Sequence, residues 1–187
     1  MNKKNTTSFY FVRHGESVNN KMKLVNGWTD CELTELGKLS AIEAGDILKE
    51  YPINRIVTSD LKRAVKTAEI IAKTIGFSGE IEKHEALRER NWGIYENKPI
   101  ANRPGLDISP EKGEDWETFF NRVNCKIEEL DLTDNTLFVG HAGVFRVIQK
   151  VFCNLENQEK ISNCKPIKIE INENSNYTSK KRIKKMP

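Results

Sequence analysis

The chain has 187 residues and a formal net charge of +3, from 30 Lys and Arg against 27 Asp and Glu. Its 37% hydrophobic and 30% charged residues are typical of a globular protein, and the length favours one domain over residues 1–187. The apolar runs are far shorter than the roughly 20 residues of a membrane span, so we expect no membrane partner. The polar start of the chain and four cysteines without a C-x-x-C pair predict a cytoplasmic protein with reduced thiols.

Strand-like and helix-like segments alternate along the chain. Short aromatic and β-branched runs predict strands over 8–12, 55–58 and 136–139, and an edge strand over 166–171. Apolar residues at helical spacing predict helices over 34–51, 59–76, 116–130 and 144–152. This alternation predicts an α/β fold, a three-layer sandwich whose mostly parallel central sheet is flanked by helices.

The first two of these helices have recognisable ends. Thr34 is a good N-cap, and Leu36, Leu39 and Ile42 are among the apolar positions that recur after it. Ser59 or Asp60 is expected to cap the next helix, which ends at Gly76. Both helices are therefore expected to turn an apolar stripe towards the sheet.

Two further segments have a distinct composition. The stretch 93–113 holds three prolines and is predicted to be a long surface loop over the site. Five Lys and Arg residues gather within 180–185, and without them the balance is 25 basic against 27 acidic residues, or −2. We interpret 172–187 as a flexible basic tail, and we expect no nucleic-acid partner beyond what this tail could contact.

Two histidines share one context, the end of an apolar strand. His14 follows the first strand and precedes Gly15, and His141 follows the strand over 136–139 and precedes Ala142. Ligands on α/β sheets bind beyond the carboxyl ends of the strands. Arg13 beside His14, and Arg63 in the first turn of a helix, present donors suited to phosphate. Together these residues predict a cationic pocket.

The residues around His14 also resemble a known signature. Phe11–Ser17 is similar to the R-H-G-E motif of the histidine phosphatase superfamily, the phosphoglycerate mutase-like proteins. Further blocks resemble that family in the same order and extend the match over about 8–152: Asn20, Asn26–Asp30, Leu33–Gly37, Thr58–Ala68, Leu87–Gly93 and Val139–Gly143.

The resemblance implies a role for each matching residue. His14 is the expected nucleophile, Glu89 the proton donor, and Arg13, Arg63 and His141 the catalytic and phosphate-binding cage. The substrate-binding residues that it implies are Arg13, Asn20, Gly27, Arg63, His141 and Ala142. A small phosphorylated substrate is expected, with no cofactor and no metal, because no carboxylates cluster with histidine as a two-metal site requires.

The chemistry of these residue types agrees with those roles. A neutral imidazole is a good nucleophile near pH 7, and a phosphohistidine would split one difficult step into two. Fixed guanidinium groups would stabilise the charge on the transferred phosphoryl oxygens.

Three functions stay open at this point. A phosphomonoester hydrolase is favoured, because the segment between Gly93 and Trp116 is shorter than the lid-forming insertion of phosphoglycerate mutases, which would leave the phosphoenzyme open to water. A 2,3-bisphosphoglycerate-dependent phosphoglycerate mutase is the first alternative. A non-catalytic protein that binds a phosphorylated ligand or nucleic acid is the second. The sequence predicts neither the physiological substrate nor the oligomeric state.

Overall fold

The computed structural model describes residues 6–130, 135–153, 160–172 and 182–186. A six-stranded sheet lies at its centre, in the order β3-β2-β4-β1-β5-β6. The strands are β1 (Thr6–Arg13), β2 (Arg55–Thr58), β3 (Ile81–Lys83), β4 (Thr136–Gly140), β5 (Ile167–Asn172) and β6 (Arg182–Lys185). The first four pair in parallel, whereas β5 and β6 are antiparallel to their neighbours.

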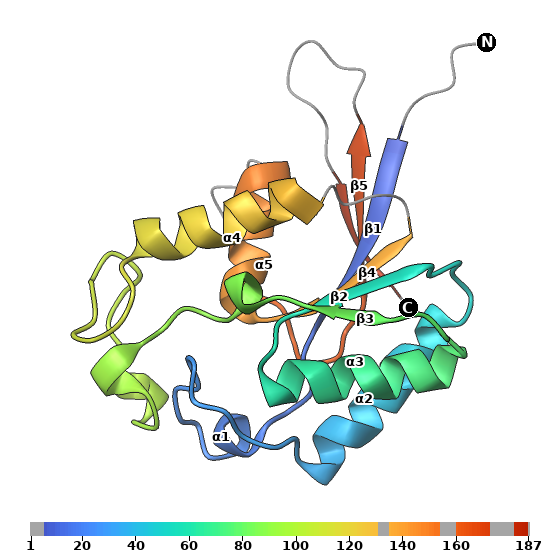
Figure 1. The fold of residues 1–187 in the computed structure, drawn as a ribbon. Helices are drawn as coiled ribbons and strands as arrows, with labels where there is room; N and C mark the ends of the chain where they lie inside the picture. The colour runs from blue at the N-terminus through green and yellow to red at the C-terminus, as the bar shows by residue number, and fades with distance from the viewer. Residues whose placement is uncertain (1–5, 131–134, 154–159, 173–181, 187) are drawn as a thin grey trace.

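Helices cover both faces of this sheet (Figure 1). On one face lie α2 (Glu35–Leu48) and α3 (Lys62–Ile75), and on the other α4 (Trp116–Leu130) and α5 (Ala142–Ile148). The remaining helical turns are α1 (Val18–Lys21), η1 (Glu85–Leu87), η2 (Gly93–Tyr95), η3 (Ile100–Asn102) and η4 (Gln149–Cys153). The predicted three-layer α/β fold with a mostly parallel sheet is therefore confirmed.

Strand β1 shows why the sheet needs both layers. Because successive side chains of a strand point to opposite faces, Phe9 and Phe11 pack in the core beneath α4 and α5, whereas Tyr10 and Val12 pack in the core against α2 and α3. All four side chains are buried. A strand that is apolar on both faces is stable only between two layers of helices.

None of the helices in the described part of the chain combines the length and the apolar composition that a membrane span requires.

The apolar stripe expected on α2 is confirmed only at its C-terminal end, where Leu48 is buried. Leu36, Leu39 and Ile42 are exposed by 60%, 58% and 42%, and the buried face consists mainly of small residues such as Ala41 and Gly45. A Cβ on Gly45 would lie 2.6 Å from Cβ of Thr74 on α3. Small residues thus allow α2 to pack closely on α3, and this close packing leaves Leu36, Leu39 and Ile42 on the outer face.

Both expected caps of α3 are also wrong. Leu61 occupies the N-cap position and makes no side-chain capping hydrogen bond. The hydroxyl of Ser59 instead bonds to His141, and Asp60 pairs with Arg88. The predicted N-cap at Thr34 is confirmed, because its hydroxyl accepts the Gly37 N–H. The end of α3 at Gly76 is confirmed as well, with φ at 72°.

The C-terminal segment differs from its prediction in two ways. Residues 167–172 form β5, which pairs with β1 and β6 and so is not an edge strand. Residues 182–185, expected within a flexible tail, form β6, and their register places Ile183 opposite Ile169. The rest of the expected tail, 173–181 and 187, lies outside the described residues.

Candidate active site

The parallel register of the sheet brings the two strand-end histidines together. Arg13 at the end of β1 lies opposite Gly140 at the end of β4, so His14 and His141 leave the sheet side by side. Their ring centroids are 5.2 Å apart, and the rings are inclined by 59°. Both side chains are buried, with 3% of His14 and none of His141 exposed. The predicted meeting of the two histidines in one place is therefore observed.

The hydrogen bonds of His14 define which nitrogen is available for reaction. Its Nδ1 lies 2.8 Å from the carbonyl oxygen of Gly15. Because a carbonyl can only accept, Nδ1 carries the proton and donates it, which leaves a lone pair on Nε2 when the ring is neutral. Burial lowers the pKa of His14 well below its ordinary value, and the charges of Arg63 and Arg13 lower it further. The imidazole is thus held neutral, with Nε2 as a free base.

His141 is held from the neighbouring strand. Its Nε2 lies 2.7 Å from Oγ of Ser59, the residue that follows β2. Burial lowers the pKa of His141 well below its ordinary value, with Arg63 as the next cause. The other ring nitrogen, Nδ1, is buried and has no hydrogen-bond partner among the described residues.

Two guanidinium groups accompany the histidines; Arg63 is fully buried, and Arg13 is partly exposed. Nη1 of Arg13 donates to the carbonyl of Ile161 over 3.1 Å. Within the described part of the chain, Nε of Arg13 and Nε of Arg63 are buried without partners. Burial lowers the pKa of both arginines, whereas the charge of Glu89 acts on both in the opposite direction. Buried donors without partners are rare in folded proteins, and an anion placed among them would supply the missing acceptors.

A turn between α1 and α2 fixes the direction of Arg63. Its Nη2 donates to the carbonyl of Gly27 over 2.7 Å, and its Nη1 donates to the carbonyl of Thr29 over 3.0 Å. Gly27 has φ at +52°, and a Cβ there would lie 2.0 Å from Oε1 of Glu96. Glycine is therefore required at this position, both for its conformation and for the approach of the carboxylate.

The carboxylate of Glu96 holds this same turn from the other side. Oε1 accepts the N–H groups of Trp28 and Trp92 over 2.8 and 3.1 Å, and Oε2 accepts the N–H and O–H of Thr29, each over 2.7 Å. One carboxylate thus satisfies four donors and fixes the carbonyl groups that orient Arg63. Nothing in the sequence around Glu96 indicates this role.

The carboxylate of Glu89 is anchored by backbone donors. Its Oε2 accepts the N–H of Gly143 at the start of α5 over 3.0 Å, and its Oε1 accepts the N–H of Arg90 over 2.9 Å. The indole N–H of Trp28 donates to its carbonyl oxygen over 2.8 Å. A Cβ on Gly143 would lie 2.0 Å from Oε1 of Glu89, so this carboxylate needs glycine beside it.

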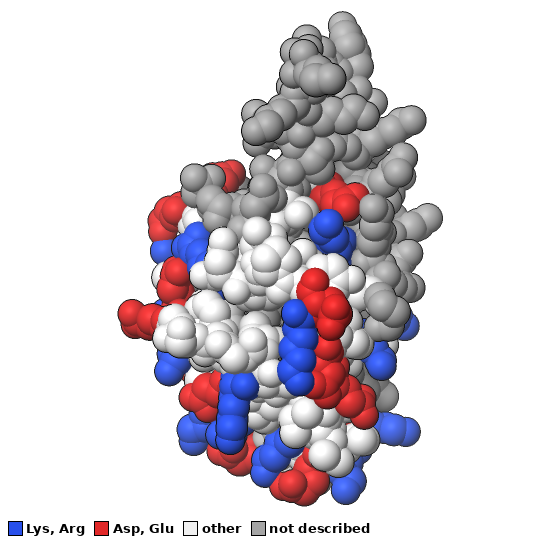
Figure 2. Space-filling model, turned by 90° about the vertical axis from the view of Figure 1, so that its right-hand side faces the viewer, with Lys and Arg blue, Asp and Glu red and all other residues white. Residues whose placement is uncertain are grey.

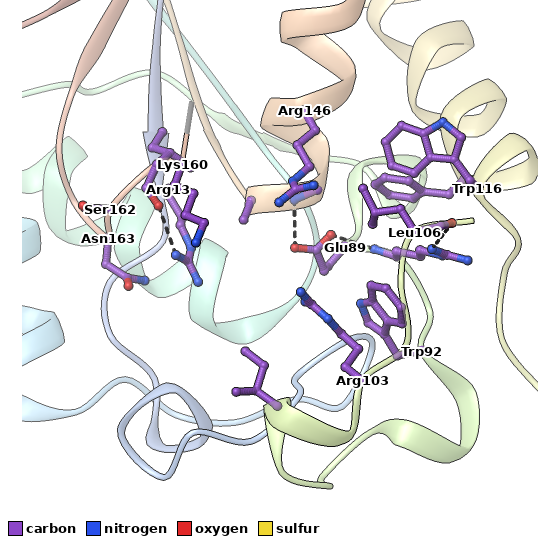
Figure 3. A pocket seen from close by; sticks show the side chains of 16 residues that line it. Arg13, Glu89, Trp92, Arg103, Leu106, Trp116, Arg146, Lys160, Ser162 and Asn163 are labelled. Carbon is purple, nitrogen blue, oxygen red and sulfur yellow. Dashed lines mark hydrogen bonds between the residues drawn. The ribbon is translucent and has the colours of Figure 1, made fainter. Parts of the chain in front are cut away.

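A cavity of about 540 Å³ opens beside these groups (Figure 3). Arg13, Glu89 and Ala142 line it, whereas His14, Arg63 and His141 are buried and are not among the lining residues. The other lining residues come from 90–106, from α4 and α5, and from 160–163: Arg90, Trp92, Ile100, Arg103, Leu106, Trp116, Phe119, Gly143, Arg146, Lys160, Ile161, Ser162 and Asn163.

Two predicted binding residues are placed differently from the rest. Asn20 forms a capping box with Ser17 at the start of α1 and does not line the cavity. Gly27 reaches the site through its carbonyl bond to Arg63 rather than by facing the cavity. The structure therefore brings together Arg13, His14, Arg63, Glu89, His141 and Ala142, and it leaves Asn20 apart from the cavity.

Three further side chains that support the site were missed in the sequence. Ser59 bonds to His141, and Nδ2 of Asn163 donates to the carbonyl of His14 over 2.6 Å. Arg90 donates to the carbonyls of Leu106, Ile108 and Glu114 and so ties the loop 103–114 to the cavity. These contacts join residues up to 149 positions apart, and nothing in the local pattern signals them.

Comparison with known proteins agrees with this geometry. The model of the histidine phosphatase superfamily (branch 1) matches residues 9–183. A 2,3-bisphosphoglycerate-dependent phosphoglycerate mutase of Cytophaga hutchinsonii is 37% identical over 155 residues, which cover 73% of this chain and 73% of that protein. Agropine synthesis reductase of Rhizobium rhizogenes is 37% identical over 75% of this chain, but the match spans only 34% of the reductase.

Solved structures share the fold over nearly the whole chain. A phosphoglycerate mutase from Bacillus anthracis has a TM-score of 0.81 at 23% identity, covering 98% of this chain and 93% of that one. A mycobacterial glucosyl-3-phosphoglycerate phosphatase has a TM-score of 0.80 at 21% identity, covering 97% and 98%. The chain therefore belongs to branch 1 of the histidine phosphatase superfamily, a family of phosphoglycerate mutase-like enzymes.

Proposed function

We propose that this protein is a phosphomonoester hydrolase that needs no metal and forms a phosphohistidine on His14, with Glu89 as the proton donor. The observation that carries the proposal is the neutral protonation state of His14. Its Nδ1–H donates to the Gly15 carbonyl, and burial lowers the pKa of the ring. Nε2 of a neutral imidazole is a nucleophile across the whole range of physiological pH.

In the first step, Nε2 of His14 attacks phosphorus and the ester P–O bond breaks. The carboxylic acid of Glu89 gives its proton to the departing alkoxide oxygen. Arg13, Arg63 and His141 contact the phosphoryl oxygens, where negative charge gathers in the transition state. Nε of Arg13, Nε of Arg63 and Nδ1 of His141 have no partner among the described residues. This supports the role, because a bound phosphoryl group would supply the missing acceptors.

In the second step, water attacks the phosphohistidine. The Glu89 carboxylate takes a proton from the water, the P–N bond breaks, and inorganic phosphate leaves with His14 neutral again. Access for water is supported by the exposure of residues at the rim of the cavity: Ile100 is 49% exposed, and Arg103 and Lys160 are exposed as well.

A small phosphorylated substrate fits this site better than nucleic acid. The cavity of about 540 Å³ lies within the usual range for small-molecule sites, roughly 300–1,000 Å³. On the face shown in Figure 2, Lys and Arg side chains are interspersed with Asp and Glu, so the described residues of this face offer no continuous basic surface.

The second candidate is a phosphoglycerate mutase, and one observation favours it: the 37% identity to a mutase over 73% of both chains. The two functions share the phosphohistidine and differ in what accepts the phosphoryl group. Isomerisation of 3-phosphoglycerate without net release of phosphate would favour the mutase.

The test is phosphate release from 4-nitrophenyl phosphate in the presence of EDTA. His14→Ala is expected to abolish release, whereas His84→Ala, which removes a histidine outside the site, should leave it unchanged. Acid quenching of the wild-type reaction should trap acid-labile phosphate on the protein, and none on His14→Ala. Full activity of His14→Ala, or a complete loss with EDTA, would contradict the proposal.

A further inference from the structure

Trp28 lies in the turn that also orients Arg63. The carbonyl groups of its neighbours, Gly27 and Thr29, accept two hydrogen bonds from the Arg63 guanidinium. The backbone N–H of Trp28 donates to Oε1 of Glu96 over 2.8 Å. The main chain around residue 28 is therefore fixed by contacts that do not involve the indole, and the indole is held by a separate set.

The indole of Trp28 extends from this turn to the backbone of Glu89. Its Nε1–H donates to the carbonyl oxygen of Glu89 over 2.8 Å, across 61 positions of the sequence. The guanidinium carbons of Arg88 and Arg122 lie 4.9 and 5.6 Å from the centre of the Trp28 ring. Both arginines are themselves paired with carboxylates, so these cation–π contacts hold the ring in one orientation.

Glu89 depends on such contacts because no helix or strand contains it; it lies between η1 and η2. Nη2 of Arg122 also donates to the Glu89 carbonyl, but over 3.4 Å, and Nη1 of the same arginine donates to the carbonyl of Ala86 over 2.9 Å. Of the two donors to the Glu89 carbonyl, Trp28 is the closer. The position of the Glu89 backbone is therefore set mainly by the indole.

The other end of Glu89 carries the chemistry. Its carboxylate accepts the N–H groups of Arg90 and Gly143 and lies among the side chains that line the cavity (Figure 3). A general acid must lie within hydrogen-bond reach of the oxygen that it protonates, and a small misplacement costs much of its effect. Both Glu89 and Arg63 are attached to the turn 27–29, Glu89 through the indole and Arg63 through the carbonyls. The turn thus relates the position of the proton donor to that of the phosphate cage.

We propose that Trp28 is a positioning residue for proton transfer: its indole N–H holds Glu89 where it can protonate the leaving oxygen of a phosphoryl group bound by Arg63. Trp28 is not among the residues that line the cavity, so it acts through Glu89 and not on the substrate. The inference rests on the proposed function, because the indole has this role only if Glu89 is the proton donor.

The test is a series of aryl phosphates whose leaving phenols become steadily more acidic: phenyl phosphate, 4-nitrophenyl phosphate and 2,4-dinitrophenyl phosphate. Phenolate is a basic leaving group that needs a proton, whereas 2,4-dinitrophenolate departs without one. The measured quantity is kcat/KM, which covers the steps up to phosphoryl transfer to His14 and excludes the later attack of water. Its ratio between the first and the last ester reports how much the general acid contributes.

Trp28→Phe keeps an aromatic ring and removes the indole N–H. We expect kcat/KM to fall roughly tenfold for phenyl phosphate and by less than about twofold for 2,4-dinitrophenyl phosphate. The inhibition constant of vanadate should not change, because the carbonyls of Gly27 and Thr29 still orient Arg63. Incorporation of 3-benzothienylalanine at position 28 replaces the N–H by sulfur in a ring of the same shape, and it should give the same result with the packing preserved.

Two further variants serve as references. Thr74→Val removes another side-chain hydrogen bond to a backbone carbonyl, at the far end of α3 from Arg63, and should leave every value at that of wild type. Glu89→Gln should lower kcat/KM for phenyl phosphate about 100-fold and leave the 2,4-dinitrophenyl ester nearly unchanged. Adding Trp28→Phe to Glu89→Gln should cause no further loss, because the group that the indole positions is already gone.

The outcomes separate the two proposals. If Trp28→Phe and the benzothienyl variant lower kcat/KM equally for all three esters, or weaken inhibition by vanadate, the indole only supports the turn; the inference is then wrong and the proposed function stands. Wild-type values for both variants with every ester would also overturn the inference, as would a further loss in the double variant. If Glu89→Gln lowers kcat/KM by the same factor for every ester, Glu89 is not the proton donor; the proposed function is then wrong on that point, and the inference fails with it.

Discussion

The two buried histidines make the stability of this protein depend on pH in a way that can be calculated. Burial, with Arg63 as the next cause, lowers the pKa of both His14 and His141 well below the ordinary value of about 6.5. In the unfolded chain each imidazole binds a proton once the pH falls below about 6.5, whereas in the folded protein it does not. The unfolded state then binds more protons, so stability falls as the pH falls.

The magnitude follows from proton linkage. Each such histidine contributes a slope of about 1.4 kcal/mol per pH unit, so the pair gives about 2.7 kcal/mol per unit between the folded-state pKa values and pH 6.5. A domain of ordinary stability has about 5–15 kcal/mol in total, so one pH unit removes a large share of it. Asp60 and Glu82, whose pKa values are lowered by hydrogen bonds to Arg88 and Arg55, act in the same direction only near pH 4 and below.

Urea unfolding monitored between pH 7.5 and 5.0 measures this slope. The free energy of unfolding should be nearly constant above pH 7 and should then fall with the stated slope. His14→Gln, which removes one of the two groups, should halve the slope to about 1.4 kcal/mol per unit. A flat profile between pH 6.5 and 5.0 would show that the folded protein protonates both rings, and it would refute the argument that His14 is held as a neutral nucleophile.

Three more substitutions test the groups that position the reacting residues. Glu96→Gln leaves two of the four donors without an acceptor and should lower the free energy of unfolding by about 2–4 kcal/mol, measured with urea. It should also raise the inhibition constant of vanadate roughly tenfold, because the turn no longer fixes the orientation of Arg63. Glu82→Gln, which breaks an ion pair remote from the site, should lower stability and leave vanadate inhibition unchanged. Gly143→Ala places a Cβ 2.0 Å from Oε1 of Glu89 and should reduce kcat about 100-fold with little change in vanadate binding. Arg90→Met frees the loop 103–114, which trypsin should then cleave much faster than in wild type; equal cleavage rates would contradict its role as a support.

The fold was predictable where one local signal determined the structure. The buried strands are short apolar runs, Thr34 caps α2, and Gly76 ends α3 in the left-handed conformation that glycine favours. The prediction failed where packing between elements decided the outcome. Leu36, Leu39 and Ile42 of α2 lie outside because Gly45 and its small neighbours bring α2 close to α3. Helical spacing alone does not reveal which face another helix will cover.

The same distinction applies to the candidate site: some of its contacts were predictable from the sequence, and others depend on packing between distant elements. His14 and His141 could be expected to meet, because each follows a parallel strand and the carboxyl ends of adjacent parallel strands lie at one edge of the sheet. Ser59 and Glu96 could not, since their partners are 82 and up to 68 positions away in the sequence. Ser59 positions a histidine ring, and Glu96 positions a turn. Both positions are defined only once the chain has folded.

The arginines show most clearly why charge in a sequence does not by itself predict specificity. Arg90 follows Glu89 directly and lines the cavity, yet three carbonyls of the loop 106–114 accept hydrogen bonds from its guanidinium. Arg103 and Arg146 match none of the family blocks, and both line the cavity with guanidinium groups that have no acceptor among the described residues. A guanidinium can recognise a substrate only when the fold leaves its donors unsatisfied. We therefore expect specificity in close relatives to change with the acceptors around 103–114 as much as with the arginines themselves.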